Sequence, residues 1–497
     1  MRLVCLVSLL ATASAIKDTK IRTRAIDYGS IPTTVDYVPP GGFPDTTWSD
    51  PSNWVEIDVS DNSLPADDDS IDASVAIADI LDTVSTSSRR VLVFPAGIYY
   101  FNSTLKIRSS NVILRGAGLS KTTFLITANG SADAEIRFDG SWAAEGRPVN
   151  GSVSSGATSV NVSDASDIEV GQVVQLYLKT GRQAWGTFIE SQLFLVKSVS
   201  GNRLTFDFPV GLTYSEEKEP YLRPMNALFN VGVEGIRIER VYEPEAQDVS
   251  NVAFRMASNT FYTDNHSINS GRSHVDIALV LGMVVERNYV HGFYINKGGY
   301  GYGFNVHLST GVRVTDNKSW DLRHHILLQQ GANHNVISYN SIEEPWQSYN
   351  DMAFHASYAY FNLIEGNIFY EGYADNSHDN ADQVDLHATG PGNVWLRNKV
   401  QNCIFSANNE TQKQTAVGNV IYDKMISVGE SHFTGANYLA GDTQWGNLSS
   451  SAVIPASLYS VETPSFFGSS AYPPFGFQVN GWGHSNTVPA GNRTRPS

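Results

Sequence analysis

The feature that most constrains this chain is a short segment that recurs along its second half. Six segments between residues 284 and 423 each combine a few alternating apolar and polar residues with an asparagine at the end of the run. A structural unit of roughly constant length, joined by loops of variable length, is the signature of a solenoid. Because the unit holds only short strand-like runs, the pattern predicts a parallel β-helix. The asparagines recur every 21 to 31 residues and are Asn288, Asn317, Asn340, Asn367, Asn398 and Asn419.

The repeated asparagines predict a ladder along the solenoid. Identical amide side chains that stack from coil to coil can hydrogen-bond one another and the backbone of the turn. An asparagine in such a ladder turns inward and cannot carry a glycan. We therefore expect Asn317, which lies in an N-x-[ST] sequence, to be unmodified.

A second alignment concerns the strand that precedes each asparagine run. His307, Gln329, His355 and His387 stand five to seven residues before the next strand of their coils. Neighbouring strands of a parallel sheet lie about 4.8 Å apart, so these side chains are expected to form a row on one face. Alternation along a strand places Asn305 and Asp385 on the same face.

Several nearby residues could complete a site around this row. Arg323 and His325 supply a fixed cation and another titratable ring, and histidine supports acid–base chemistry near neutral pH. Tyr300 and Tyr302 belong to a glycine-rich stretch that could present rings for stacking on sugars. We expect His355, His307, His387, Arg323 and His325 to be catalytic. Substrate contacts are expected from Tyr300, Tyr302, Asn305, Gln329 and Asp385. In an alternative interpretation that stays open, the histidines have only a structural role and pack against neighbouring side chains.

The first part of the chain adds a resemblance to this pattern. Residues 93–125 (VFPAGIYYFNSTLKIRSSNVILRGAGLSKTTFL), together with the asparagine-punctuated coils, resemble the pectate-lyase-like right-handed β-helix superfamily. The resemblance implies an all-β fold and a secreted, eukaryotic, carbohydrate-active protein. The superfamily also contains hydrolases, epimerases and non-enzymatic adhesins, so it implies no single reaction. Its better-known lyases often use calcium, which makes calcium a candidate cofactor. No metal-ligand motif stands out, so no residue is assigned to a metal.

Pattern shifts divide the chain into regions. Residues 70–84 have apolar residues at helical spacing and predict one short helix, and residues 150–212 alternate in the manner of a small antiparallel β insertion. The expected regions are 1–15 signal peptide, 16–65 extended lead-in, 66–149 first coils with the helix, 150–212 insertion, 213–430 main β-helix, and 431–497 C-terminal cap and tail.

The N-terminal residues predict export. Arg2, the apolar run from Leu3 to Leu10 and the small residues at 13–15 have the order of a secretory signal. Its removal would leave Cys403 as the one cysteine of the mature chain, so no internal disulfide is expected. Glycans are expected at the sequons Asn102, Asn129, Asn150, Asn161, Asn265, Asn409, Asn447 and Asn492.

Charge limits the classes of partner. The formal net charge is −16, which opposes a nucleic-acid surface, and no segment is apolar for long enough to span a bilayer. We expect a monomer whose partner is a polysaccharide.

Three functions remain open. A polysaccharide lyase needs a group that neutralises a uronate carboxylate, a base and an acid, which the histidine row and Arg323 could supply. A glycoside hydrolase needs two carboxylates, for which Asp351, Asp382 and Asp385 are available. Catalytic carboxylates could also come from an acidic loop that contains Asp375, Asp379, Asp382 and Asp385. A glycan-binding solenoid without catalysis would need neither. The lyase acting on a uronic-acid polymer is the preferred hypothesis.

Overall fold

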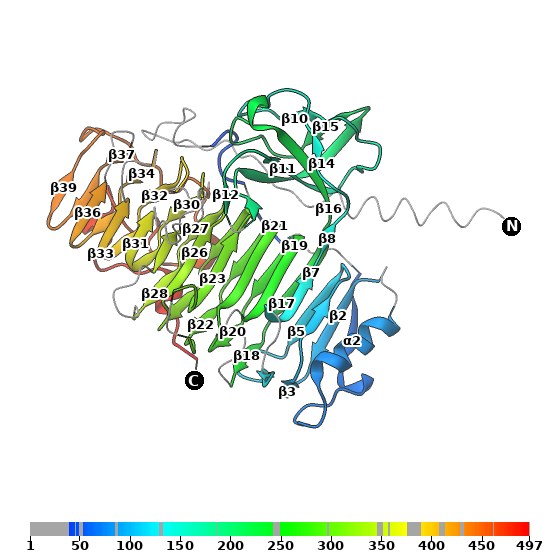
Figure 1. Cartoon of the computed structure of the whole chain (residues 1–497). Coiled ribbons are helices and arrows are strands. Elements are labelled where there is room, and N and C mark those ends of the chain that lie inside the picture. The colour runs from blue at the N-terminus through cyan, green and yellow to red at the C-terminus, as the bar shows by residue number, and fades with distance from the viewer. Residues whose placement is uncertain are drawn as a thin grey trace.

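A computed structural model shows the fold of the chain. The structure describes residues 39–44, 46–48, 53–84, 88–128, 133–184, 186–241, 249–295, 298–344, 351–355, 358–374, 389–406, 413–427, 432–460 and 462–496. The described chain forms a right-handed parallel β-helix, as the repeats predicted, and most of its strands belong to one continuous parallel array (Figure 1).

The coils have three faces, which we name A, B and C in the order in which the chain visits them. Face A is followed directly by face B in the two longest strands, β19 (Ser250–Thr263) and β21 (Ser273–Glu286), which bend through the corner between the faces. Face A contains the first halves of these two strands and β4 (Leu105–Ile107), β7 (Ala134–Asp139), β23 (Tyr302–His307), β26 (His324–Gln329), β29 (Met352–Phe354), the end of β31 (Ile368–Ala374), the end of β33 (Lys399–Ser406) and β36 (Lys424–Ser427).

Faces B and C complete each coil. Face B contains the second halves of β19 and β21 and β1 (Val55–Asp58), β2 (Arg90–Phe94), β5 (Val112–Gly116), β17 (Leu228–Glu234), β24 (Thr310–Thr315), β27 (Val336–Ser338), β30 (Leu363–Glu365), β32 (Val394–Leu396), β34 (Thr415–Val417) and β37 (Phe433–Gly435). Face C contains the starts of β31 and β33 and β3 (Gly97–Phe101), β6 (Thr122–Ile126), β18 (Arg237–Arg240), β20 (His266–Ile268), β22 (Tyr289–His291), β25 (Lys318–Trp320), β28 (Ser341–Glu343), β35 (Val420–Ile421) and β38 (Asn437–Leu439), which β39 (Asp442–Gln444) joins antiparallel.

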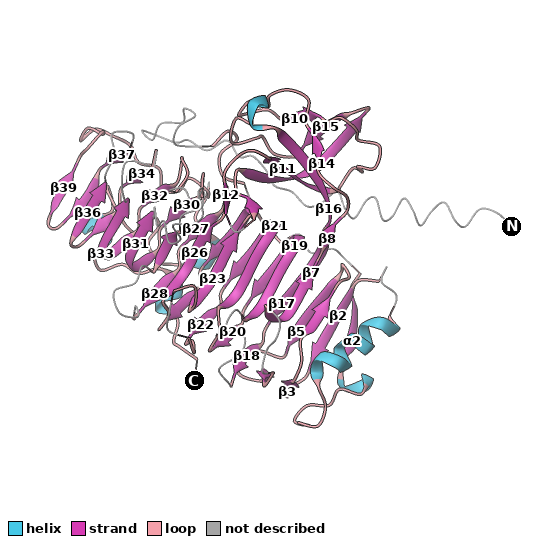
Figure 2. Cartoon of the chain, viewed as in Figure 1, coloured by secondary structure: helices cyan, strands magenta, loops and turns pink. Residues whose placement is uncertain are grey.

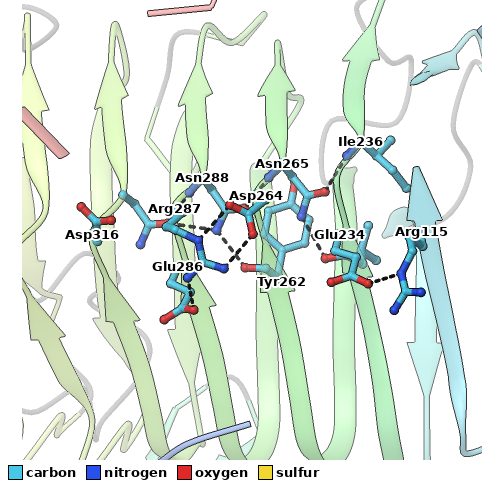
Figure 3. Close-up of polar contacts among 12 residues, drawn as sticks. Arg115, Glu234, Ile236, Tyr262, Asp264, Asn265, Glu286, Arg287, Asn288 and Asp316 are labelled. Atoms are coloured by element: carbon cyan, nitrogen blue, oxygen red, sulfur yellow. Dashed lines mark hydrogen bonds and ion pairs between the residues drawn. The ribbon is translucent and has the colours of Figure 1, made fainter. Parts of the chain in front are cut away.

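The asparagine ladder lies at the corner from face B to face C. Each ladder asparagine accepts, at Oδ1, the backbone N–H of the ladder residue before it, at 2.9–3.0 Å. The ladder continues beyond the six expected residues to Asn265 and Asn437, and Figure 3 shows its start at Asn265 and Asn288. A second, shorter ladder of Asn335, Asn362 and Asn393 lies at the corner from face A to face B.

A left-handed residue precedes every ladder asparagine from Asn265 to Asn437. Asp264, Asp316 and Tyr339 have φ of 53–56°, and two of the ladder's turns use glycine there, Gly366 and Gly418. Such a residue reverses the chain sharply, and the asparagine that follows satisfies the backbone groups that the turn leaves unpaired. This pairing of a turn residue with an amide is what repeats in the sequence.

The expected helix and insertion are both present (Figure 2). Helix α2 (Ala73–Thr83) begins at Asp72, whose carboxylate accepts the N–H of Ser74 at 2.9 Å, and it buries Ile77 and Ile80 over the first coils. The insertion is wider than residues 150–212, because its antiparallel sheet starts at Ser141 and ends at Asn226. Its strands are β8 (Ser141–Trp142), β9 (Arg147–Pro148), β10 (Ser159–Asn161), β11 (Val173–Leu178), β14 (Ser191–Ser200), β15 (Arg203–Phe206) and β16 (Pro220–Asn226), beside the hairpin of β12 (Gln183–Ala184) and β13 (Thr187–Phe188).

The C-terminal tail runs back along the solenoid. Arg397 holds it by donating to the carbonyl oxygens of four tail residues, and Lys318 and Lys399 hold two carbonyls each. Five short helical turns are described outside the coils. The tail contains η4 (Ser465–Phe467), η5 (Asn480–Gly483) and α3 (Pro489–Asn492). The N-terminal region contains η2 (Ser60–Asn62), and the insertion contains η3 (Glu216–Lys218). None of the described helices is long and apolar enough to cross a membrane.

The ladder predicts a large cost for removing one member. Asn340→Ala would leave the backbone N–H of Asn317 without its acceptor and the carbonyl of Val314 without its donor. Each buried group left unpaired costs about 1–3 kcal/mol, so we expect a loss of about 3 kcal/mol, measured by denaturant unfolding. Asn492→Ala, at an exposed asparagine, is the control and should change stability little. Equal effects of the two changes would contradict the ladder's role.

The structure also revises the glycosylation expectations. Asn317 is buried in the ladder as expected, but so is Asn265, whose Nδ2 donates to the Val233 carbonyl at 3.0 Å. The expectation of a glycan on Asn265 is therefore wrong, because its amide has no room for one. Asn102, Asn150, Asn161, Asn447 and Asn492 are exposed, whereas Asn129 and Asn409 lie outside the described residues.

Glycopeptide mapping after expression through a eukaryotic secretory route tests this assignment. We expect Asn447 and Asn492 to be modified and Asn265 and Asn317 to be unmodified. A glycan on either ladder asparagine would show that the corner from face B to face C is not formed as described.

Candidate functional site

The outer surfaces of the three faces differ in what covers them. Much of face B is apolar outward and is covered from both ends of the chain: Phe43 packs with Val336 and Leu363, and Trp48 packs on Phe261 at a ring distance of 4.5 Å. The charged side chains at the ends of its strands pair with one another, as Arg115 does with Glu234 and Arg313 with Glu286. Tail residues pack on the remainder of face B and on part of face C. The outer side of face A, in contrast, carries charged and amide side chains in successive strands. Face A is therefore the candidate site.

The structure places three of the four aligned residues in register. His307 pairs directly with Gln329, and the backbone N–H of His355 donates to the Leu328 carbonyl at 2.9 Å, which sets His355 beside Gln329 in the next strand. His387 and Asp385 lie outside the described residues. The described strand that pairs with β29 on the side away from β26 is Gly372–Ala374.

His307 is held by a carboxylate that the sequence analysis did not select. Asp276 lies on face A of β21, and its Oδ1 is 3.2 Å from Nε2 of His307. An ionised carboxylate accepts a hydrogen bond, so Asp276 orients the ring of His307 through Nε2. Nδ1 is buried and has no hydrogen-bond partner among the described residues. The side chain as a whole is 17% exposed. Asp276 therefore holds a partly exposed imidazole in one orientation.

Asp276 stays ionised although it is buried. Burial acts to raise its pKa, but the charge that His307 carries when protonated, its hydrogen bond, and the charges of Arg255 and Arg272 outweigh burial and hold the pKa well below its usual range. Oδ2 of Asp276 is 3.3 Å from Nη2 of Arg255. Asp276 is thus a fixed anion that orients its neighbours and does not serve as a proton donor.

An amide chain extends from the same carboxylate. Asn305 donates from Nδ2 to Oδ1 of Asp276, and Gln329 donates from Nε2 to Oδ1 of Asn305, both at 2.8 Å. The three polar side chains come from three successive strands and are almost completely buried. Asn305 and Gln329 therefore lie beside His307 and are oriented by Asp276. The expectation that they contact substrate is wrong, because both side chains are buried.

The remaining expected residues form a second group at the other end of the strands. The ring of Tyr302 is 5.5 Å from that of His324, which in turn is 6.2 Å from the ring of His355. The guanidinium of Arg323 lies 6.0 Å from the Tyr302 ring centre. Because Tyr302 and His307 end the same strand, Tyr302 and Arg323 lie about 17 Å from His307 along it. The row therefore divides into two clusters, and His355, whose backbone lies beside Gln329 and whose ring approaches His324, stands between them.

Two further expectations about this face are wrong. His325 points into the solenoid, where Nδ1 is 2.8 Å from Oγ of Ser319, and burial lowers its pKa to about 3. It cannot share the outer surface with its neighbour His324, because adjacent residues of a strand face opposite sides. Tyr302 is only 3% exposed, so its ring is not free to stack on a sugar, whereas Tyr300 is half-buried.

One available signal could have indicated Asp276. The segment SHVDIALVLGMVVE contains Asp276 inside an apolar run that ends at Glu286, and it precedes the aligned strand by one coil. The pairing of Asp276 with Asn305 shows that both occupy the same column of face A. No three metal-ligating side chains converge among the described residues, so the structure offers calcium no preformed site there.

Comparisons with known proteins agree with the architecture. No family model matches the sequence, and no curated protein matches it. Among solved structures, the tailspike gp61 of Pseudomonas phage phi297 is 12% identical, with a TM-score of 0.49 over 77% of this chain and 73% of that one. The tailspike of E. coli bacteriophage HK620 in complex with a pentasaccharide is 12% identical, with a TM-score of 0.48 over 77% and 61%.

An enzyme also appears among these structures. The A-module of the mannuronan C-5 epimerase AlgE6 from Azotobacter vinelandii is 11% identical, with a TM-score of 0.41 over 78% of this chain and all of that one. Likenesses of this size carry no function from those proteins to this chain. The fold rests on the chain's own strand pairings, and the function must be argued from face A.

The buried histidines predict a pH dependence of stability. Burial lowers the pKa of His274 to about 3, although Nε2 is 2.9 Å from the Gly292 carbonyl oxygen. The folded protein keeps this ring neutral while the unfolded chain takes up a proton below pH of about 6.5. Its contribution is therefore complete above that pH and is lost as the pH falls toward 3.

Unfolding of wild type and His274→Gln at two pH values checks this. Between pH 7 and pH 5 the variant should lose about 2 kcal/mol less stability than wild type, since one pKa unit corresponds to about 1.4 kcal/mol. The same loss in both proteins would mean that His274 is solvated in the folded state.

Proposed function

We propose that the protein is a secreted enzyme that acts on a polysaccharide at face A, with His307 as the group that transfers the proton. The observation that carries the proposal is the contact of His307 with Asp276, which orients a partly exposed imidazole on face A. A histidine that is oriented by an anion is prepared for general base catalysis. The stacked strands give face A a row of polar side chains, which suits an extended polymer.

The preferred reaction is β-elimination on a uronic-acid polymer. This reaction needs a base for the proton at C5, a donor to the leaving oxygen and a positive group near the carboxylate. His307 would take the first role. His355, whose backbone is in register with His307 two strands away, would take the second role. Arg323 lies about 17 Å from His307 along the strand direction, so it is not assigned the third role at the same sugar. No metal step is needed by this scheme.

The residues of face A favour elimination over hydrolysis. A glycoside hydrolase needs a carboxyl group that is protonated before the reaction. Asp276 is held ionised, and Asp351, which we considered for that role, is 0% exposed and points into the solenoid. The other two carboxylates considered, Asp382 and Asp385, lie outside the described residues.

A screen of purified polysaccharides tests the proposal. Uronic-acid polymers such as alginate and pectate would be compared with neutral glucans. A lyase produces unsaturated uronates, which absorb in the ultraviolet, whereas a hydrolase releases reducing ends without that absorbance. Reducing ends without ultraviolet absorbance would replace elimination by hydrolysis. Binding without cleavage would favour a non-catalytic solenoid, and absence of both would refute the proposal.

Substitution of His307 tests the assigned role. His307→Ala should lower turnover by about a hundredfold or more, the usual scale for a lost acid–base group. Because His307→Ala also removes a partner of the buried Asp276, the melting temperature is measured to separate a loss of catalysis from a loss of folding. Asp276→Asn should also lower turnover, since a neutral amide orients the imidazole less firmly than a carboxylate does. A folded, fully active His307→Ala protein would refute the base.

His355→Ala separates the two clusters. If the cluster of His324 and His355 donates the proton to the leaving group, this change should lower turnover on a similar scale. A loss confined to His307→Ala would place the chemistry entirely at the Asp276 end of the face.

A further inference from the structure

One exposed aromatic residue on face A has no part in the site described above. Tyr370 is 40% exposed, although its neighbours Phe369 and Glu371 are buried. It lies in β31, where Phe369 pairs with Val400 and Glu371 pairs with Cys403, so Tyr370 faces two residues of β33. The extra residue of this bulge is in β33, and bulges are over-represented next to active sites.

The bulge is built on a buried carboxylate. Oδ2 of Asp351 accepts the backbone N–H of Tyr370 at 2.6 Å and that of Glu371 at 3.2 Å. Asp351 is 0% exposed, and burial raises its pKa to about 7. Burying an acidic side chain costs free energy. The hydrogen bonds that Asp351 accepts from Tyr370 and Glu371 offset part of this cost. The distortion at Tyr370 is therefore a fixed part of the fold.

Hydrogen bonds across two strands place Tyr370 near the second cluster. The carbonyl of Asp351 accepts the N–H of His325 at 2.8 Å, and the N–H of Asp351 donates to the Glu371 carbonyl at 3.0 Å. Tyr370, the residue before Glu371, therefore stands two strands beyond His324, where face C passes into face A.

We propose that Tyr370 is the sugar-stacking residue of face A and that it binds the apolar side of a pyranose ring. A tyrosine ring is a flat amphipathic surface with little side-chain entropy to lose, and the C–H groups of a pyranose present a matching flat surface. This role was expected of Tyr302, which is buried. The inference rests on the proposed function in that the ligand is the same polysaccharide.

Exposure alone does not carry this assignment, because single exposed aromatics are common. Tyr422 is equally exposed at 38%, but its hydroxyl is 2.9 Å from Nδ1 of His484 and it lies by face C. Tyr422 therefore helps to hold the C-terminal tail against the solenoid. Tyr422 is therefore the matched control for Tyr370.

The test measures binding and kinetics with a uronic-acid oligosaccharide taken from the polymer that the screen selects. Tyr370→Ala should raise KM, and the Kd measured by calorimetry, by about tenfold, which corresponds to about 1.4 kcal/mol, with kcat changed less than twofold. Tyr370→Phe should retain wild-type binding, because it keeps the ring. Tyr422→Ala should leave both constants unchanged.

The outcomes separate this inference from the proposed function. If Tyr370→Ala binds as wild type while His307→Ala is inactive, the stacking role is refuted and the proposed function stands. If Tyr370→Phe is as weak as Tyr370→Ala, the hydroxyl and not the ring is recognised, which also refutes stacking. If wild type binds the oligosaccharide without cleaving it and Tyr370→Ala loses that binding, the stacking role stands and catalysis is refuted.

Discussion

The asparagine ladder is the interaction on which the rest of the structure depends. A solenoid turns its chain at every corner, and each turn removes backbone groups from the sheet ladders and from water. Along the corner from face B to face C, a residue with positive φ makes the turn and an asparagine satisfies the groups that the turn would leave unpaired. Because each amide also bonds the next one, neighbouring coils are tied at a fixed spacing. Side chains on the faces then stand in register.

Because the strands are in register, residues at matching positions of successive coils lie side by side on one face. Asp276, Asn305 and Gln329 come from strands far apart in the chain, yet 2.8 Å hydrogen bonds join each to the next. The same stacking brings His307 against Asp276. Both termini cover face B, much of whose outer side is apolar, and the tail reaches face C. The outward positions of face A therefore remain for a functional site. The inward positions of the same face, such as Phe304 and Val306, form the core.

The candidate site uses burial in two opposite ways. Asp276 remains ionised because cations and hydrogen bonds surround it, whereas Asp351 lies in an apolar interior that raises its pKa to about 7. The first arrangement yields a permanent anion that orients an imidazole. The second yields a carboxyl that holds two backbone N–H groups and thereby shapes a bulge. Both residues act on the surface through their neighbours.

The sequence by itself determined the solenoid, the ladder, the cap helix and the row of His307, Gln329 and His355. These follow from local rules: a period, a turn residue before each asparagine, and alternation along a strand. Tertiary structure alone decided which side chains meet. No local pattern shows that Asp276 approaches His307. Nor does one show that Asn265 belongs to the buried ladder, or that Tyr302 is buried whereas Tyr370 is exposed. Those outcomes depend on loop lengths between coils and on what packs above each face, and the strand period carries no information about either.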